Sequence, residues 1–248
     1  MIQILLSGAG GKMGQVISRS VSERVDCRIA AGIDRQSAAV DYPIFEKPSD
    51  CDVCCDVIID FSHPSLLEPL LDYAVSRKIP AVVCTTGLSP EQVDKLKQAA
   101  DKIPVFFSAN MSLGVSLLCE LAKKAAKVLG SDFDIEIIEK HHNRKLDAPS
   151  GTALMLADAI AEELAQPPQY VYDRHSRRAA RSQEEIGIHS VRGGTIVGEH
   201  EILFAGHDET LSLTHTAMSK EIFATGAINA AIFLAKQQPG LYNMGDLV

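Results

Sequence analysis

The sequence has no tryptophan, few aromatic residues, and no apolar run of the roughly 18 residues that a membrane-spanning helix needs. Its first residues also lack the basic flank and small-residue cleavage site of a secretory signal. We therefore expect a cytoplasmic protein with no membrane partner. A hydrophobic fraction of 46% and a charged fraction of 23% are typical of a globular chain, and 248 residues suffice for one large domain or two modest ones.

Basic residues are in deficit, since 24 Lys and Arg stand against 32 Asp and Glu, giving a formal net charge of −8. Binding to nucleic acid depends on a basic surface, so this balance argues against a nucleic-acid partner. An anionic small molecule would need a local basic cluster. The sequence offers two candidates, EKHHNRKLDAPSGTA at residues 139–153 and DRHSRRAAR at residues 173–181.

The six cysteines do not form a recognisable disulfide or metal framework. A chain of this length without a secretory signal more often carries reduced cysteines than disulfides. The segment CDVCC at residues 51–55 contains a C-x-x-C pair, but no second pair of Cys or His follows at metal-ligand spacing. We therefore expect no metal site, and no redox role for these cysteines.

Strands and helices are predicted to alternate along the first half of the chain. The predicted strands are the apolar runs at residues 2–7, 27–35, 56–62, 80–87 and 103–110. Amphipathic helices are predicted between them, one of which has Ser89 as its N-cap and Pro90 in its first turn. This alternation on short connections predicts an α/β fold with a Rossmann-like, doubly wound parallel sheet.

The pattern changes near residue 112. Residues 111–130 predict a long helix, and the next segment, FDIEIIEKHH, alternates apolar and polar residues as a half-exposed strand does. Between residues 187 and 217, strands follow one another with glycine turns and no helix, which predicts an antiparallel sheet. The apolar face of a final helix is expected to return to the first sheet. We therefore predict one domain at 1–112 and 221–248, with a second, α+β domain inserted at 113–220.

A glycine-rich turn, GAGGKMG, follows the first predicted strand and opens a helix, where backbone N–H groups approach a pyrophosphate in dinucleotide-binding proteins. Its glycines are spaced as G-x-x-G-x-x-G, at Gly8, Gly11 and Gly14, so a tight turn without a ligand is an alternative. Asp34 lies about twenty residues further on, where an acid binds the adenosine ribose. Because the adjacent Arg35 suits the extra phosphate of NADPH, we predict that both NADH and NADPH bind.

Two further segments follow the fourth and fifth predicted strands, CTTG at residues 84–87 and SANMS at residues 108–112. The carboxyl ends of parallel strands meet at one edge of a sheet, so both segments are expected at the edge where a nicotinamide would bind. Ordinary connections between strand and helix are the alternative.

The segment at residues 139–153 combines acid–base and anion-binding side chains. His141 and His142 are adjacent, so on a strand they point to opposite faces and cannot play the same part at one atom. Lys145 suits a carboxylate, and the helix predicted to follow it offers unpaired backbone N–H groups at its start. These groups belong to Ser150, Gly151 and Thr152. Asp147 is expected to cap this helix rather than to orient Lys145.

Other interpretations of this segment are less well supported. Adjacent histidines lack the H-x-x-x-H spacing of a metal site on a helix, and no carboxylate completes a familiar ligand set. Ser150 lies in PSGTA rather than in the G-x-S-x-G elbow of a serine hydrolase. A structural loop with solvated charges is the remaining alternative.

Taken in order, GAGGKMG, DFSHP, CTTG, SANMSLGV, EIIEKHHNRKLDAPSGTA and VRGGTIVGEHEILFAG resemble the motifs of the dihydrodipicolinate reductase family, which belongs to bacterial lysine and diaminopimelate biosynthesis. The most specific is E-x-x-E-x-H-H-x-x-K-x-D-x-P-S-G-T-A, matched at residues 136–153. The resemblance implies a nicotinamide-binding domain and an inserted mixed-sheet domain that binds substrate and assembles a homotetramer. It also implies a substrate with two carboxylates on a six-membered nitrogen ring.

The resemblance also implies roles for individual residues. His141 is expected to donate a proton, assisted by Lys145, after hydride addition to a conjugated imine. The expected substrate-binding residues are His142, Lys145, Ser150, Gly151 and Thr152. The expected cofactor-binding residues are Gly8, Gly10, Gly11, Lys12, Met13, Gly14, Asp34, Arg35, Phe61, Cys84, Thr85, Thr86, Ser108, Ala109, Asn110 and Met111. The arginine-rich segment at residues 165–187 has no assigned role and is expected to be a solvated loop.

Two other functions stay open. A related dehydrogenase acting on another dicarboxylate could share the two-domain plan, although it has no need of the H-H-x-x-K set followed by S-G-T. A dinucleotide-sensing regulator would need a DNA-binding module or an appended domain, and neither is recognisable in the sequence.

Overall fold

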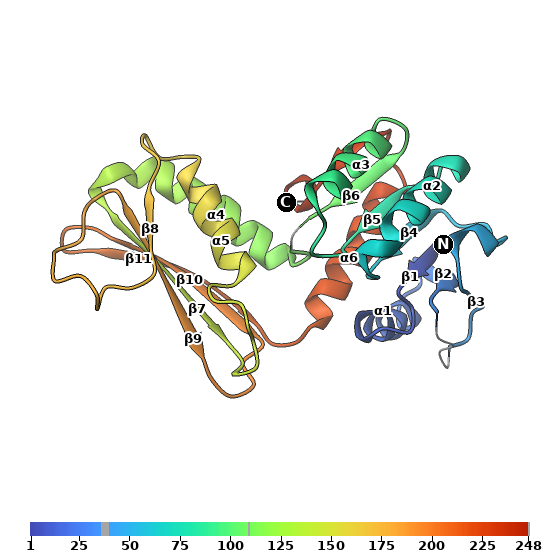
Figure 1. Ribbon diagram of the computed structural model, residues 1–248, viewed down its shortest axis with the longest axis horizontal. Helices are drawn as coiled ribbons and strands as arrows, with labels where there is room; N and C mark the ends of the chain where they lie inside the picture. The colour runs from blue at the N-terminus through green and yellow to red at the C-terminus, as the bar shows by residue number, and fades with distance from the viewer. Residues whose placement is uncertain (36–39, 109, 248) are drawn as a thin grey trace. The chain divides into compact units, whose positions relative to one another are not determined.

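The computed structural model describes residues 1–35, 40–108 and 110–247 (Figure 1). It divides into two compact units, the first formed by Met1–Leu113 with Lys220–Val248 and the second by Gly114–Ser219. Among the described residues, no helix is long and apolar enough to cross a membrane. The roles assigned to the two domains from sequence remain predictions.

The first unit contains a seven-stranded sheet in the order β12-β6-β5-β4-β1-β2-β3, in which every neighbouring pair is parallel. The strands are β1 Ile2–Ser7, β2 Cys27–Ile33, β3 Ile44–Phe45, β4 Val57–Asp60, β5 Ala81–Val83, β6 Pro104–Phe107 and β12 Gly240–Tyr242. The predicted Rossmann-like sheet is confirmed. Sequence reasoning missed β3 and β12, because edge strands of two or three residues carry no apolar run.

Helices cover both faces of this sheet. The alternation of side chains along β1 sends Ile4 and Leu6 into one apolar cluster and Leu5 into the other. The first cluster contains residues of α1 (Lys12–Ser22) and α6 (Glu221–Leu234), and the second contains residues of α2 (Leu67–Arg77) and α3 (Pro90–Ala100). The final helix therefore returns to the first sheet, as predicted. The predicted start of α3 is also confirmed, since Ser89 and Gln92 form a reciprocal capping box.

The second unit contains a five-stranded mixed sheet in the order β11-β10-β7-β9-β8. Its strands are β7 Asp134–His141, β8 Gln169–Val171, β9 Glu185–Arg192, β10 Gly198–Ala205 and β11 Thr210–Ala217. The antiparallel sheet predicted from the glycine turns is wrong, because β9 pairs in parallel with both β7 and β8. Although β9 and β10 are consecutive in sequence, β7 lies between them. The mixed sheet implied by the family resemblance is confirmed.

One face of this second sheet is covered by two helices, α4 (Leu113–Leu129) and α5 (Gly151–Ala161) (Figure 1). The burial of β7 alternates along the strand, so Ile135 and Ile137 pack under the helices. The next position with the same orientation is Glu139, which is fully buried. A carboxylate therefore continues an otherwise apolar series.

The arginine-rich segment is not simply a solvated loop. Arg174 donates hydrogen bonds to Glu185 at 2.8 Å and to Glu136 at 2.6 Å. Arg181 contacts Glu136 at 3.5 Å and donates to the backbone carbonyl of Ile135 at 3.4 Å. The expectation failed because the acids that hold these arginines come from β7 and from the start of β9.

Candidate active site

The glycine turn of the first unit is shaped by close backbone contacts. Gly8 has a φ of 81°, and a Cβ there would lie 2.5 Å from the carbonyl oxygen of Phe61. A Cβ at Gly14 would lie 2.2 Å from the carbonyl oxygen of Gly8. Helix α1 begins after Gly11, and no side chain caps its first turn. Its amino-terminal N–H groups and the positive end of its dipole are therefore available to an anion.

Asp34 follows β2 and contacts the glycine turn directly. Its Oδ2 accepts a hydrogen bond from the backbone N–H of Gly10 at 2.8 Å. A Cβ at Gly10 would be only 3.1 Å from the same oxygen, so this glycine permits the approach. The acid predicted to bind a ribose thus also fixes the conformation of the turn.

A cleft of about 480 Å³ opens beside this turn, and its lining includes Gly8, Gly11, Asp34, Arg35 and Phe61. The buried hydroxyl oxygen of Ser62, another lining residue, has no hydrogen-bond partner within the described chain. An unsatisfied hydroxyl, an uncapped helix start and an acid at the end of β2 fit the phosphate and ribose groups of a dinucleotide.

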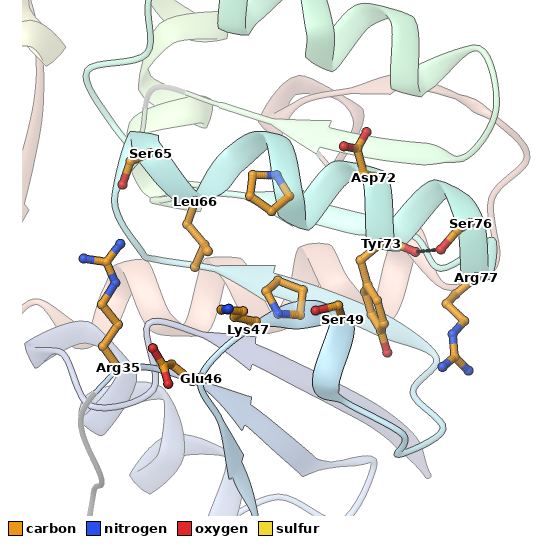
Figure 2. A pocket seen from close by; sticks show the side chains of 12 residues that line it. Arg35, Glu46, Lys47, Ser49, Ser65, Leu66, Asp72, Tyr73, Ser76 and Arg77 are labelled. Carbon is orange, nitrogen blue, oxygen red and sulfur yellow. Dashed lines mark hydrogen bonds between the residues drawn. The ribbon is translucent and has the colours of Figure 1, made fainter.

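The cleft adjoins a second, larger groove of about 930 Å³, with which it shares Arg35 and Glu46. Figure 2 shows Arg35 and Glu46 at one end of this groove and Arg77 at the other, with Lys47 between them. Sequence reasoning missed Glu46 and Lys47, which directly follow the two-residue strand β3.

The predicted cofactor residues after β5 and β6 do not line either of these cavities. Thr85 donates through its buried Oγ1 to Asp60 at 2.7 Å, and burial raises the pKa of the Cys84 thiol well above its usual value. The Ser108 hydroxyl donates to the carbonyl oxygen of Asn110 at 2.9 Å. These side chains therefore stabilise the two connections that follow the strands.

The other predicted cofactor residues differ in exposure. Lys12 and Thr86 are exposed, whereas Met13 is partly buried against the core and Met111 is buried in it. Ala109 lies outside the described residues.

The second unit places His141 at the last position of β7, where it is 9% exposed. Its Nδ1 lies 2.6 Å from Oε2 of Glu139. Arg192, on β9, donates to both oxygens of the same carboxylate, at 2.7 and 2.8 Å. Burial favours the neutral acid, but the hydrogen bonds from Arg192 and His141 outweigh it and lower the pKa of Glu139 to about 2. The imidazole therefore contacts an ionised carboxylate.

His142 and Lys145 lie in the loop between β7 and α5. Nδ1 of His142 is buried and lacks a hydrogen-bond partner in the part of the chain that is described. Nζ of Lys145 lies 2.9 Å from Oδ2 of Asp147, and its hydrogen bond lowers the pKa of that carboxyl. Asp147 therefore orients Lys145, and the prediction that it caps the helix is wrong.

Helix α5 is capped by Ser150, whose Oγ accepts from the N–H of Ala153 at 3.2 Å. The backbone N–H of Ser150 donates to Oε1 of Glu139 at 3.1 Å, so the prediction that it is unpaired is wrong. Gly151 is exposed, and a Cβ there would meet no atom within 4 Å. The approach to the first turn of α5 is therefore open at Gly151.

His200, on β10, completes this cluster and was missed from sequence. Its Nε2 lies 2.9 Å from Oγ of Ser150, and its ring packs edge-to-face on His141 with centroids 5.2 Å apart. Burial, followed by repulsion from His141, lowers the pKa of His200 to about 4. His200 is therefore held neutral where it packs against His141.

The described residues include no cluster of three or more His, Cys, Asp or Glu with the geometry of a metal site. The candidate site is thus built from an imidazole, a lysine and a helix start. These groups can deliver a proton next to a bound anion.

The Rossmann-like sheet with its glycine turn places the chain among dinucleotide-binding proteins, a class that includes the nicotinamide-dependent oxidoreductases. Models of two domain families match the chain, the amino-terminal domain of dihydrodipicolinate reductase at residues 2–111 and its carboxyl-terminal domain at residues 114–248. The chain belongs to the dihydrodipicolinate reductase family. It is accordingly an oxidoreductase that depends on NADH or NADPH, which confirms the predicted family and cofactor class.

Individual relatives agree over the full length. A 4-hydroxy-tetrahydrodipicolinate reductase of Caldanaerobacter subterraneus subsp. tengcongensis is 49% identical over 248 residues, covering 100% of this chain and 98% of the relative. One from Clostridium tetani is 46% identical, covering 98% and 96%. The solved structure of a dipicolinate-bound dihydrodipicolinate reductase from Paenisporosarcina sp. TG-14 has a TM-score of 0.84, with 27% identity and 100% coverage of both chains.

Proposed function

We propose that this protein reduces 4-hydroxy-tetrahydrodipicolinate to tetrahydrodipicolinate with NADH or NADPH, in lysine and diaminopimelate biosynthesis. The relatives named above carry the substrate in their names, and a similar structure holds dipicolinate. The observation that carries the proposal is the position of His141, buried against an ionised carboxylate next to the lysine loop and the start of α5.

The first unit supplies the residues for the dinucleotide. The glycine turn and the start of α1 hold its pyrophosphate, Asp34 binds the adenosine ribose, and Arg35 accommodates the extra phosphate of NADPH. When bound, the reduced nicotinamide supplies the hydride. The further residues proposed for this site are Lys12, Met13, Phe61, Cys84, Thr85, Thr86, Ser108, Ala109, Asn110 and Met111.

The second unit binds the dicarboxylate and supplies the proton. A substrate carboxylate replaces Asp147 as the partner of Lys145, while Gly151 and Thr152 offer the start of α5 to an anion. His142 contributes a further polar contact, and Ser150 acts through its hydroxyl, since its N–H is bound to a carboxylate. As negative charge develops on the ring, His141 protonates it, with assistance from Lys145.

We also place the enzyme in the cytoplasm as a homotetramer assembled through the sheets of its second units. Helices α4 and α5 cover one face of that sheet. Ile138 and Val191 alternate with the residues packed under those helices, so they belong to the opposite face. Light scattering on the purified protein tests the assembly, and a monomeric mass would contradict it.

The decisive experiment follows the oxidation of NADH, and separately of NADPH, with substrate formed in place by a dihydrodipicolinate synthase from pyruvate and aspartate semialdehyde. We expect synthase-dependent oxidation by the wild-type protein. His141→Gln should lower kcat by about 100-fold or more without weakening NADH binding, because a general acid contributes at least about that factor.

A matched control is His207→Gln, since the His207 side chain is 97% exposed and should leave kcat unchanged. Tight NADH binding by the wild-type protein with no oxidation would contradict the proposal. That outcome would favour a dinucleotide sensor, or a reductase of another dicarboxylate.

A further inference from the structure

The carboxylate of Glu139 lies at the centre of the candidate proton-donor site. It is 0% exposed and accepts hydrogen bonds from three different elements of the second unit. The donors are Arg192 and the Ser190 side chain on β9, the backbone N–H of Ser150 at the start of α5, and the imidazole of His141 on its own strand. A buried carboxylate with this many donors is held in one orientation.

These contacts fix which nitrogen of His141 carries the exchangeable proton. An ionised carboxylate only accepts hydrogen bonds, so Nδ1 of His141 must donate, at 2.6 Å, and Nε2 is left to exchange a proton. The same carboxylate anchors Ser150, two residues before Thr152. One side chain thus orients both the acid and the adjoining anion-binding turn.

Gly198, the first residue of β10, lies beside Nε2. A Cβ at this position would stand 3.1 Å from Nε2 and 3.4 Å from Cδ2 of His141. Such a contact is tighter than an ordinary van der Waals distance, so the imidazole would have to shift. The missing side chain leaves the imidazole in the position that Glu139 selects.

We propose that Glu139, clamped by Arg192, is a positioning residue that holds His141 with Nε2 as its proton-delivering atom, and that Gly198 keeps room for that orientation. The inference rests on the proposed function, in which His141 protonates the substrate. It adds an electrostatic role for Glu139, because the ionised carboxylate stabilises the imidazolium that gives the proton. The other charged or titratable groups around the imidazole are Arg192 and His200, and His200 in turn interacts with Lys145 and His215.

The test is Glu139→Gln, which keeps the shape of the side chain and removes its charge. We expect kcat to fall by about 100-fold while KM changes less than about threefold, since His141 loses its charged partner whereas the glutamine oxygen still accepts from the N–H of Ser150 and holds the anion-binding turn. The alkaline limb of the kcat profile should move to lower pH by about one unit, because the imidazolium has lost its partner. A merely structural role would lower the yield of folded protein without moving that limb.

A second readout needs no turnover. The affinity of the cofactor-free protein for dipicolinate, measured by calorimetry across pH, should decline as the pH rises, because the dianion loses a cationic partner. In Glu139→Gln this decline should occur about one unit lower in pH than in the wild type. An unchanged pH dependence of dipicolinate affinity would overturn the inference.

Glu136→Gln is a matched control. Glu136 lies on the same strand and likewise holds an arginine and a histidine, Arg174 and His189, but it points to the opposite face. The Glu136→Gln variant should keep kcat within about twofold of the wild type, and the alkaline limb of its kcat profile should stay at the same pH. An equal effect of Glu136→Gln and Glu139→Gln would reduce Glu139 to a structural residue and overturn the inference.

Gly198→Ala keeps the proposal testable if Glu139→Gln fails to fold. The added methyl group should lower kcat without moving the alkaline limb of the kcat profile, since the carboxylate of Glu139 stays in place. Turnover lost in His141→Gln but retained in both Glu139→Gln and Gly198→Ala would overturn the inference and leave the proposed function standing. A wild-type protein that oxidises no NADH, yet shows the shifted dipicolinate profile in Glu139→Gln, would contradict the proposed function alone.

Discussion

Mild acid should destabilise the second unit through one buried side chain, His200. Its imidazole is 5% exposed, and burial together with repulsion from His141 lowers its pKa to about 4, from an ordinary value of 6.5. The unfolded chain therefore takes up a proton as the pH falls through 6.5, while the folded protein does not. The contribution of His200 to the free energy of unfolding is fully present above pH 6.5 and is lost as the pH falls towards 4.

The size of the effect follows from the two pKa values. Between about pH 7.5 and pH 5.5, linkage gives a loss of about 1.4 kcal/mol in the free energy of unfolding. Glu139 does not interfere in this window, because its pKa is lowered from 4.5 to about 2 and its contribution is lost only at more acid pH. His215, whose pKa burial also lowers, contributes in the same direction and is present in every variant compared.

Urea unfolding at the two pH values measures this loss, and His200→Gln isolates the share of one residue. Glutamine keeps a hydrogen-bonding partner for Ser150 but does not titrate, so the variant should lose about 1.4 kcal/mol less than the wild type. His207→Gln, at an exposed position, should behave as the wild type does. Equal losses in the wild type and His200→Gln would show that His200 is not held neutral, and would refute the reasoning.

Two further predictions concern the glycine turn after β1 and the arginine-rich segment. Gly14→Ala should weaken NADH binding by at least about tenfold in a fluorescence titration, because its Cβ would lie 2.2 Å from the carbonyl oxygen of Gly8. Gly193→Ala is the control: the nearest atom to its added Cβ is at 4.0 Å, so NADH binding should not change. Equal NADH affinity in the wild type, Gly14→Ala and Gly193→Ala would contradict the prediction for Gly14. Arg181→Met should cost about 2 kcal/mol in chemical unfolding, since it removes a partly buried partner of Glu136, and a loss below about 0.5 kcal/mol would contradict it.

The first sheet could be predicted from sequence because each of its central strands is marked by residues that are adjacent in the chain. Each of its central strands is an apolar run, and parallel strands buried on both faces require such runs. The glycine turn after β1 could be predicted for the same reason, since neighbouring residues determine its geometry. The short strands β3 and β12 escaped detection, and with β3 the residues Glu46 and Lys47, which follow it and line the larger groove of the first unit.

The candidate proton-donor site was only partly predictable. His141 and Lys145 are reactive types in a short segment, so the sequence alone singled them out. Glu139 belongs to the family motif, but the sequence alone assigned no role to it, although its position is informative. It continues the buried series that Ile135 and Ile137 begin, and a carboxylate in such a place needs a partner.

That partner could not be identified without the topology of the second sheet. An antiparallel arrangement of the successive strands would have paired β9 with β10 and left Glu139 without Arg192. In the mixed sheet, β9 instead runs parallel to β7, so Arg192 is the register partner of His141, and β10 places His200 opposite Glu139. The wrong antiparallel prediction and the missed site residues therefore have one cause. Arg192 and His200 reach Glu139 and His141 only through pairings between strands about fifty to sixty residues apart, which local patterns do not encode.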